Sequence, residues 1–281
     1  MFPTTLSASR VEHYMQQQFV AMSSTSAKGT PVGGLLLNVL LVAFIGGFVA
    51  GMISSVIGFG GGIILIASLS TLTSPQEAIA LTAPAILLGN LHRVWLFRAD
   101  LDVRALTRFI FGAVPATLAG SLLLPYLPED GLRLAMGLFI LAFVARELLQ
   151  SHPTVGTSSK PWLLVAGGFA NGAAASTIGG GGPLSAPLLA AFGLVRGAFI
   201  VTEAAGNAMV QFLKIVVFSA TGLLTTNLLP ATFATMSSIS IGNRVGKRLL
   251  STIDDVLLRR LFRLALVALG LRLLLLALGN G

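Results

Sequence analysis

The sequence GGFVAGMISSVIGFGGGIILIASL at Gly46–Leu69 recurs without gaps, 121 positions later, as GGFANGAAASTIGGGGPLSAPLLA at Gly167–Ala190. Nine of the 24 aligned positions are identical. Each copy carries a glycine cluster within apolar sequence, Gly60–Gly62 in the first and Gly179–Gly182 in the second. A chain inside a bilayer has no water to satisfy its backbone, so it breaks a helix only where the break is sheltered or used. Matched breaks in two halves are typical of the substrate site of a transporter built from repeats.

The composition indicates a polytopic membrane protein. Hydrophobic residues make up 54% of the chain and charged residues 10%, and the mean hydropathy is +0.88, whereas soluble domains are about 25% charged. The sequence has no cysteine, which excludes disulfides, thiolate metal sites and cysteine nucleophiles. The net charge of +8 does not indicate nucleic-acid binding, because most basic residues lie between apolar spans and no basic patch carries interleaved aromatics. No motif in the sequence predicts a cofactor or a metal site.

Ten apolar spans predict an all-α integral membrane protein. They lie near 35–56, 60–72, 76–97, 105–125, 132–149, 161–178, 183–194, 198–220, 228–243 and 256–278. The second and seventh are short for a crossing and each follows a glycine cluster, so we expect half-helices there. The remaining spans predict about eight transmembrane helices.

Four regions follow from this pattern. We expect a polar N-terminal tail over 1–34, a first transmembrane repeat over 35–150, a polar linker over 151–160 and a second repeat over 161–281. The first 30 residues lack the compact apolar core of a signal peptide, and we assign them no function.

The charges of the loops predict that the two repeats have opposite orientations. The first-half loop Trp95–Arg108 is basic and is expected in the cytoplasm, and the next one, Pro125–Gly131, carries Glu129 and Asp130. In the second half the loop Thr221–Asn227 is uncharged. The following connection is strongly basic, with Arg244, Lys247, Arg248, Arg259, Arg260 and Arg263. This reversal indicates an inverted-topology repeat, a common architecture of secondary transporters.

The glycine clusters themselves admit more than one interpretation. A dinucleotide-binding loop needs a preceding strand and a soluble βαβ unit, which the apolar flanks exclude. Glycines can also simply let membrane helices pack closely, and we expect this of Gly46, Gly47, Gly51, Gly167, Gly168 and Gly172. Consecutive glycines before a helix instead expose several backbone N–H groups, which attract anions. We therefore predict substrate binding by Gly58, Gly60, Gly61, Gly62, Gly179, Gly180, Gly181 and Gly182, with Ser55 and Ser176 as matched hydroxyl donors.

Polar residues within the apolar spans follow the same 121-residue offset. Asn90 aligns with Gln211, and Arg93 aligns with Lys214. An amide and a cation three residues apart lie on one helix face, so two such faces predict a central cavity for an anionic substrate. The alternative is that Arg93 and Lys214 lie near span ends and extend to the membrane interface. Lys214 is deeper in its span and fits that alternative less well.

Glu203 is the one carboxylate placed well inside a span. An ionisable group at that depth predicts a functional site, and we expect Glu203 to carry a coupling proton. The alternatives are a structural pair with Lys214 or a place just above the interface. Lys214 is 11 residues further along, about three helical turns, so we expect no direct pair between them and Glu203 is predicted to titrate on its own. His92 fits an interfacial position better than a proton carrier.

With these residues in view, the chain resembles the sulfite exporter TauE/SafE family of bacterial membrane proteins. The resemblance is carried by SSVIGFGGGIILIASL at Ser54–Leu69, STIGGGGPLSAPLL at Ser176–Leu189, the Ala-x-x-x-Thr of Ala78–Thr82 and Ala198–Thr202, and Val-Gly-Lys-Arg at Val245–Arg248. It covers about Val39 to Leu276. The second cluster departs from the first, with Gly180 in place of Phe59 and Pro183 in place of Gly62, so the two half-sites are chemically unequal.

The resemblance implies a multi-pass transporter in the bacterial inner membrane that exports sulfite, sulfoacetate or related organosulfonates. We expect a secondary carrier with a small anion as substrate, the lipid bilayer around it and protons as the coupling ion. A passive anion channel would also fit the glycine-lined site. A membrane-embedded enzyme is disfavoured because His13 and His152 lie in the tail and the linker, and His92 has no serine at helical spacing. The sequence does not indicate an oligomeric state.

Overall fold

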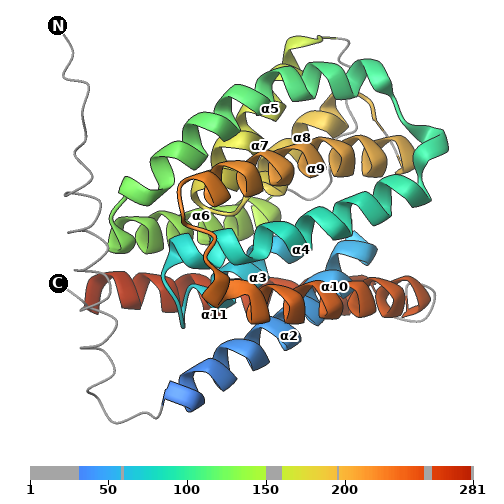
Figure 1. The fold of residues 1–281 in the computed structure, drawn as a ribbon. Coiled ribbons are helices and arrows are strands. Elements are labelled where there is room, and N and C mark those ends of the chain that lie inside the picture. Colours follow the sequence, from blue (N-terminus) through green and yellow to red (C-terminus); the bar gives the residue numbers. More distant parts are fainter. Residues whose placement is uncertain (1–31, 58–59, 150–159, 195, 250–254, 280–281) are drawn as a thin grey trace, which may run out of the picture. The chain divides into compact units, whose positions relative to one another are not determined.

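A computed structural model of the chain describes residues 32–57, 60–149, 160–194, 196–249 and 255–279 (Figure 1). Within these ranges the structure contains α-helices and no β-strand, which confirms the all-helical fold class. The helices are α2 (Val32–Ile57), α3 (Gly61–Leu69), α4 (Pro75–Leu96), α5 (Val103–Leu123), α6 (Glu129–Leu149), α7 (Trp162–Thr177), α8 (Gly181–Ala191), α9 (Arg196–Ala220), α10 (Leu229–Leu249) and α11 (Asp255–Gly279). Three short 3-10 turns join them, η1 (Arg98–Asp100), η2 (Leu124–Tyr126) and η3 (Thr226–Leu228).

The chain divides into two compact units, residues 1–39 and 40–281. The contacts described below all lie within the second unit. The expected tail and linker fall almost entirely outside the described residues.

Both predicted helix breaks are present. Helices α3 and α8 have only 9 and 11 residues, and each follows a glycine with a left-handed backbone. Gly60 has φ 92° and Gly179 has φ 74°, a region that glycine adopts without the steric strain of a side chain. The chain therefore stops α2 and α7 and starts a new helix a few residues later, as the glycine clusters predict.

Five helices are long and apolar enough to cross a membrane, within the part of the chain that the structure describes. These spans are Leu37–Ser55, Pro75–Leu96, Val103–Tyr126, Gly197–Ala220 and Arg260–Gly279. The expected total of about eight is not confirmed, because α7 has only 16 residues and because α6 and α10 carry several charges towards their ends.

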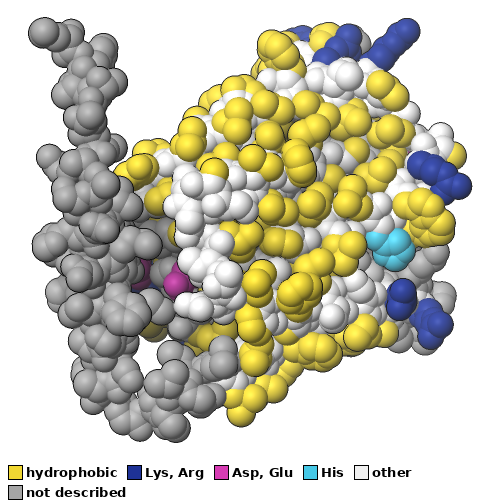
Figure 2. All heavy atoms as spheres, viewed as in Figure 1, with side chains coloured by type: hydrophobic (Ala, Val, Ile, Leu, Met, Phe, Trp, Pro, Cys, Tyr) yellow, Lys and Arg dark blue, Asp and Glu magenta, His cyan; other side chains and the backbone are white. Residues whose placement is uncertain are grey.

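The surface agrees with a membrane environment. In the face shown in Figure 2, hydrophobic side chains cover most of the surface, and the Lys and Arg side chains in view lie towards its upper and right-hand margins. Large apolar side chains on the outer faces of the helices are exposed, for example Phe111 at 77% and Phe169 at 57%. A soluble protein rarely exposes so much contiguous apolar surface, whereas lipid favours it.

Contacts between the two halves follow the repeat. Helix α5 packs on α7. The helices at the equivalent positions of the repeat, α10 and α2, also pack on each other. Helix α4 packs on its counterpart α9, and α6 on its counterpart α11 (Figure 1). The opposite orientation of the two repeats in the bilayer remains a prediction from the loop charges.

Small residues make these helix contacts possible. A Cβ atom at Gly168 would lie 1.9 Å from the carbonyl oxygen of Phe109, and one at Gly51 would lie 2.4 Å from that of Ile239. Such close backbone approach is typical of helix packing in membranes. These glycines therefore serve packing, as their place outside the clusters predicts.

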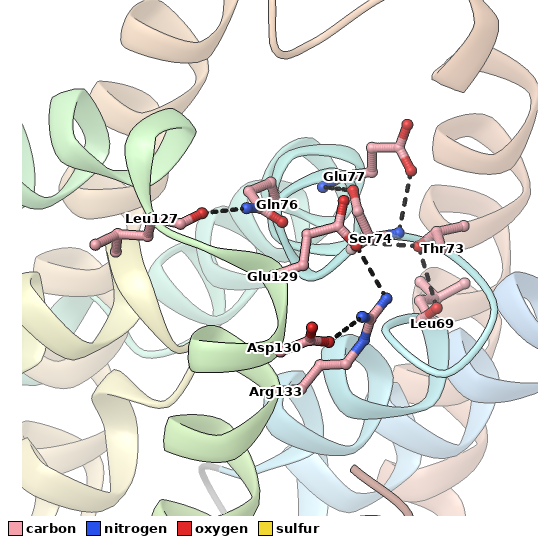
Figure 3. A network of polar contacts seen from close by, with 9 residues as sticks. All are labelled: Leu69, Thr73, Ser74, Gln76, Glu77, Leu127, Glu129, Asp130 and Arg133. Carbon is pink, nitrogen blue, oxygen red and sulfur yellow. Dashed lines mark hydrogen bonds and ion pairs between the residues drawn. The ribbon is translucent and has the colours of Figure 1, made fainter. Parts of the chain in front are cut away.

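Polar contacts hold the end of the protein where α4 and α6 begin (Figure 3). Ser74 and Glu77 form a capping box at the start of α4, with reciprocal bonds of 3.2 Å between each backbone N–H and the other side chain. Gln76 donates to the carbonyl oxygen of Leu127 at 2.8 Å. Arg133 binds Glu129 and Asp130 at 3.1 Å each, so the acidic loop predicted to be external is ordered by its own arginine.

Candidate functional site

The two glycine breaks meet at one cavity of about 80 Å³. The first break contributes Gly60 and Gly62 to its wall, and the second contributes Gly179, Gly181 and Gly182. The breaks are also in direct proximity, since a Cβ atom at Gly179 would lie 2.7 Å from Cδ1 of Ile66 on α3. Two segments that are 121 residues apart in the sequence thus form opposite sides of one site.

Polar side chains from α4 and α9 line another part of the cavity. Helix α4 contributes Asn90 and Arg93, and α9 contributes Glu203, Asn207 and Gln211. The α9 residues are spaced by four, so they lie on one face of the helix. Asn90 and Gln211, which the repeat offset pairs, therefore line the same cavity.

Arg93 and Glu203 form an ion pair across the cavity. Arg93 Nη1 lies 3.6 Å from Glu203 Oε2, and the two side chains are 14% and 3% exposed. Arg93 also donates to Asn90 Oδ1, and Asn207 donates to Glu203 Oε1 at 2.7 Å. Glu203 does not pair with Lys214 of its own helix, as expected, since Lys214 donates to Ala175. The expectation that Glu203 stands on its own is wrong, because Arg93 of the other repeat is its ion partner.

Three buried polar atoms at the cavity have no hydrogen-bond partner among the described residues. They are Asn90 Nδ2, Glu203 Oε2 and Gln211 Oε1. Because Asn90 Oδ1 accepts from Arg93, the N–H groups of its amide are the ones left over. A buried polar group without a partner is destabilised by about 1–3 kcal/mol. A small polar ligand or water in the cavity would remove this penalty.

Lys214 lies away from the cavity wall. Its side chain is fully buried, its Nζ donates to the carbonyl oxygen of Ala175 at 2.9 Å, and the Nζ lies 5.9 Å from the centre of the Phe218 ring. Ala175 is in the last turn of α7, just before the second break, where helix carbonyls lack partners within the helix. Lys214 is not among the described residues that line the cavity, so it does not form a matched pair with Arg93 there.

Four other predicted site residues also lie off the cavity wall. A Cβ at Gly61 would meet the carbonyl oxygen of Ala50, and one at Gly180 would meet the Phe139 ring. Ser176 donates to the carbonyl oxygen of Gly172 at 2.6 Å, and Ser55 donates to Asn243 Oδ1 at 3.0 Å. Gly58 lies outside the described residues.

Three polar cavity residues, Ser54, Asn207 and Asn243, were missed by the sequence reasoning. Asn207 follows Glu203 by four residues, a spacing that would have identified it. Asn243 comes from α10, and no counterpart at the repeat offset marks it. Ser55 donates a hydrogen bond to the side chain of Asn243, so this serine contributes to the site only through Asn243.

A second cavity, of about 310 Å³, lies beside the first. Its wall includes His92 and Trp95 of α4 together with Arg244 of α10. Gly89 and Asn243 line both cavities, so these two residues form the partition between them. The neighbouring basic loops predict that this second cavity is on the cytoplasmic side.

No group of three or more His, Asp or Glu residues suited to a metal ion occurs within the described ranges. The described cavity wall carries one guanidinium, one carboxylate and several side-chain amides, beside the first turns of α3 and α8.

Comparison with known proteins identifies the family of the chain. The family model described as "Sulfite exporter TauE/SafE" matches residues 43–273. The matched range contains both glycine breaks and all the cavity residues named above. No curated protein and no solved structure matches the chain.

Proposed function

The chain belongs to the sulfite exporter TauE/SafE family of integral membrane transporters, and we propose that it exports small sulfur-containing anions across the bacterial inner membrane. Sulfite, sulfoacetate and related organosulfonates are the substrate class, as the family resemblance implies. The transport is secondary and is coupled to protons.

The observation that carries this proposal is the meeting of the two glycine breaks at a cavity that contains Arg93. Helix α3 begins at Gly61, between the lining residues Gly60 and Gly62, and α8 begins at the lining residue Gly181. The first N–H groups of a helix have no acceptor within the helix and attract anions. A small oxyanion between the two N-termini would accept from them, from the Arg93 guanidinium and from the Asn90 amide.

Glu203 is the proposed carrier of the coupling proton. It is the only carboxylate among the described residues that line the cavity, and it lies beside the group that would bind the anion. A charged group this deep in a membrane protein is typical of substrate and proton pathways.

Lys214 keeps a proposed role in transport, but as a structural support and not as a residue of the cavity wall. Its ammonium group binds the last turn of α7, so we propose that it supports the transport rate by stabilising the second break, without contact to the anion. Ser55 would act in the same indirect way through Asn243.

Transport in inverted membrane vesicles tests the proposal. Radiolabelled sulfite, sulfoacetate, taurine and thiosulfate would be offered with and without a pH gradient, and vesicles that lack the protein are the control. We expect saturable uptake of at least one sulfur anion that a second one inhibits. Non-saturating, electrically conductive flux would indicate the anion channel instead, and no flux of any of the four anions would refute the substrate class.

A further inference from the structure

We infer that the central cavity binds a proton and an anion together, so that both cross the membrane in the same direction. This inference rests on the proposed function, which leaves the direction of the proton open. It is carried by the charges in the cavity and by their geometry.

Arg93 and Glu203 are the only titratable side chains among the described residues that line the cavity. The lining residues from α2, α3, α7, α8 and α10 are uncharged. No other charged side chain near the helices that pack on α9 is on the described cavity wall. Asp100 of η1 lies against Gly197, at the start of α9, and Arg104 and Arg108 of α5 do not line the cavity. Lys214 does not line it either, although its ammonium group donates to the carbonyl oxygen of the lining residue Ala175.

The empty cavity is therefore electrically balanced, with one guanidinium opposite one carboxylate. The contact is loose, because 3.6 Å between Arg93 Nη1 and Glu203 Oε2 exceeds the usual hydrogen-bond distance. Glu203 Oε2 also has no hydrogen-bond partner among the described residues. An incoming anion and the Glu203 carboxylate would compete for the same guanidinium.

A net charge inside a low-dielectric site is strongly unfavourable. An anion that enters beside ionised Glu203 would leave the cavity with a net negative charge, and a proton that binds alone would leave it with a net positive charge. When a proton from water binds Glu203 and one monoanion binds beside Arg93, the cavity stays neutral. The neutral carboxyl group can then also donate its O–H to the anion.

Proton binding and anion binding therefore favour each other, and such coupling is reciprocal. The two neutral states, empty and doubly occupied, are the ones suited to crossing between the two sides. One proton and one monoanion move together, and the pair carries no net charge, so export is driven by the concentration gradient of the anion and not by the inward proton gradient. An exchange of a proton for an anion would require the cavity to cross in its charged states.

Inverted vesicles, whose cytoplasmic face points outward, distinguish co-transport of a proton with the anion from exchange of a proton for the anion. The direction of the pH gradient that drives accumulation differs between the two. The probe is radiolabelled methanesulfonate, a monoanion whose charge does not change between about pH 5 and pH 8, with sulfite as a second probe. We expect accumulation when the outer medium is more acidic than the lumen. Accumulation driven by an acidic lumen would overturn the inference and leave a proton-exchanging exporter. No transport of either probe under any gradient would instead contradict the proposed function.

Binding to the purified protein gives a second readout. For wild type, the affinity for methanesulfonate should rise as the pH falls, by at most about tenfold per pH unit, because one proton is taken up per anion. Glu203→Gln imitates the protonated residue, so its affinity should be high and independent of pH. Glu147→Gln is the matched control, since Glu147 faces Arg263 at 3.9 Å away from the cavity and should keep the wild-type pH dependence. A pH-independent wild-type affinity would overturn the inference, and the vesicle experiment still decides if Glu203→Gln does not fold.

Discussion

Arg93 on α4 and Glu203 on α9 are 110 residues apart in the sequence and form an ion pair of 3.6 Å at the central cavity. The pair joins the two repeats at the point where their glycine breaks meet. Arg93 and Glu203 are not at equivalent positions of the two repeats, so the pair breaks the symmetry of the site. An anion therefore meets one cationic side and one side with a carboxylate.

Removal of Arg93 should abolish anion binding. Arg93→Gln removes the only cation on the described cavity wall and leaves Glu203 as a buried charge opposite a neutral amide. Breaking a buried ion pair from one side destabilises a protein by about 3–5 kcal/mol, and the 14% exposure of Arg93 places this case near the lower limit. The measurement is the thermal midpoint of the purified protein together with methanesulfonate binding.

The double variant Arg93→Gln/Glu203→Gln separates stability from binding. It removes both charges, so we expect it to recover most of the lost stability while anion binding stays absent. If the double variant binds the anion as wild type does, the guanidinium is not the binding group.

Glu203→Gln should also alter transport in a specific way. The amide cannot release a proton, so accumulation driven by a pH gradient should be lost. Exchange of labelled for unlabelled anion between compartments of equal pH should persist. Loss of both activities in a protein of wild-type abundance would indicate a structural role for Glu203, and accumulation at the wild-type level would remove it from the coupling.

Lys214→Met distinguishes direct binding from support of the second break. The side chain is fully buried and binds the Ala175 carbonyl, so we expect a lower maximal rate with a nearly unchanged concentration for half-maximal transport. A raised half-maximal concentration at an unchanged maximal rate would show that Lys214 contacts the anion, as its alignment with Arg93 predicts.

Gly62→Ala should weaken anion binding while the protein still folds. Gly62 lines the cavity, and its new Cβ would meet only a flexible atom, Ile86 Cδ1, at 3.3 Å. Gly46→Ala is a matched control, since its Cβ would meet Leu65 Cδ1 at the same 3.3 Å but away from the cavity wall. Equal methanesulfonate affinities for the two variants would show that the first cluster only packs.

A substitution at Gly61 would not test anion binding by the glycine cluster, because Gly61 is packed against backbone. A Cβ there would lie 2.0 Å from the Ala50 carbonyl oxygen, so Gly61→Val should disturb the fold and not only the site. We expect reduced abundance of that variant in the membrane, measured by immunoblot against Gly62→Ala.

Gly89→Val should slow passage between the two cavities. Gly89 lines both of them, and its Cβ would lie 3.3 Å from Ile239 Cγ2 and 3.7 Å from Asn243 Nδ2. We expect a lower transport rate, because the added side chain narrows the region that the two cavities share. A transport rate equal to that of wild type would show that the anion does not pass this point.

The helices and their breaks were predictable because they depend on local properties of the chain. Hydropathy over about 20 residues defines a membrane helix, and consecutive glycines define a break through their backbone freedom. The expected spans near 60–72 and 183–194 correspond to the short helices α3 and α8. The repeat offset also placed Asn90 and Gln211 at one cavity, because equivalent helices α4 and α9 face each other.

The sequence by itself thus determined the membrane class, the helices and the two breaks, while the place of the substrate site stays a prediction. The tertiary structure decided which side chains meet there: that Glu203 faces Arg93, that Lys214 turns to the end of α7, and that Asn243 joins the cavity from α10. These outcomes depend on the rotation and register of one helix against another, which are set by packing between residues far apart in the chain. An internal repeat relates equivalent positions, but it does not require equivalent side chains to have equivalent partners.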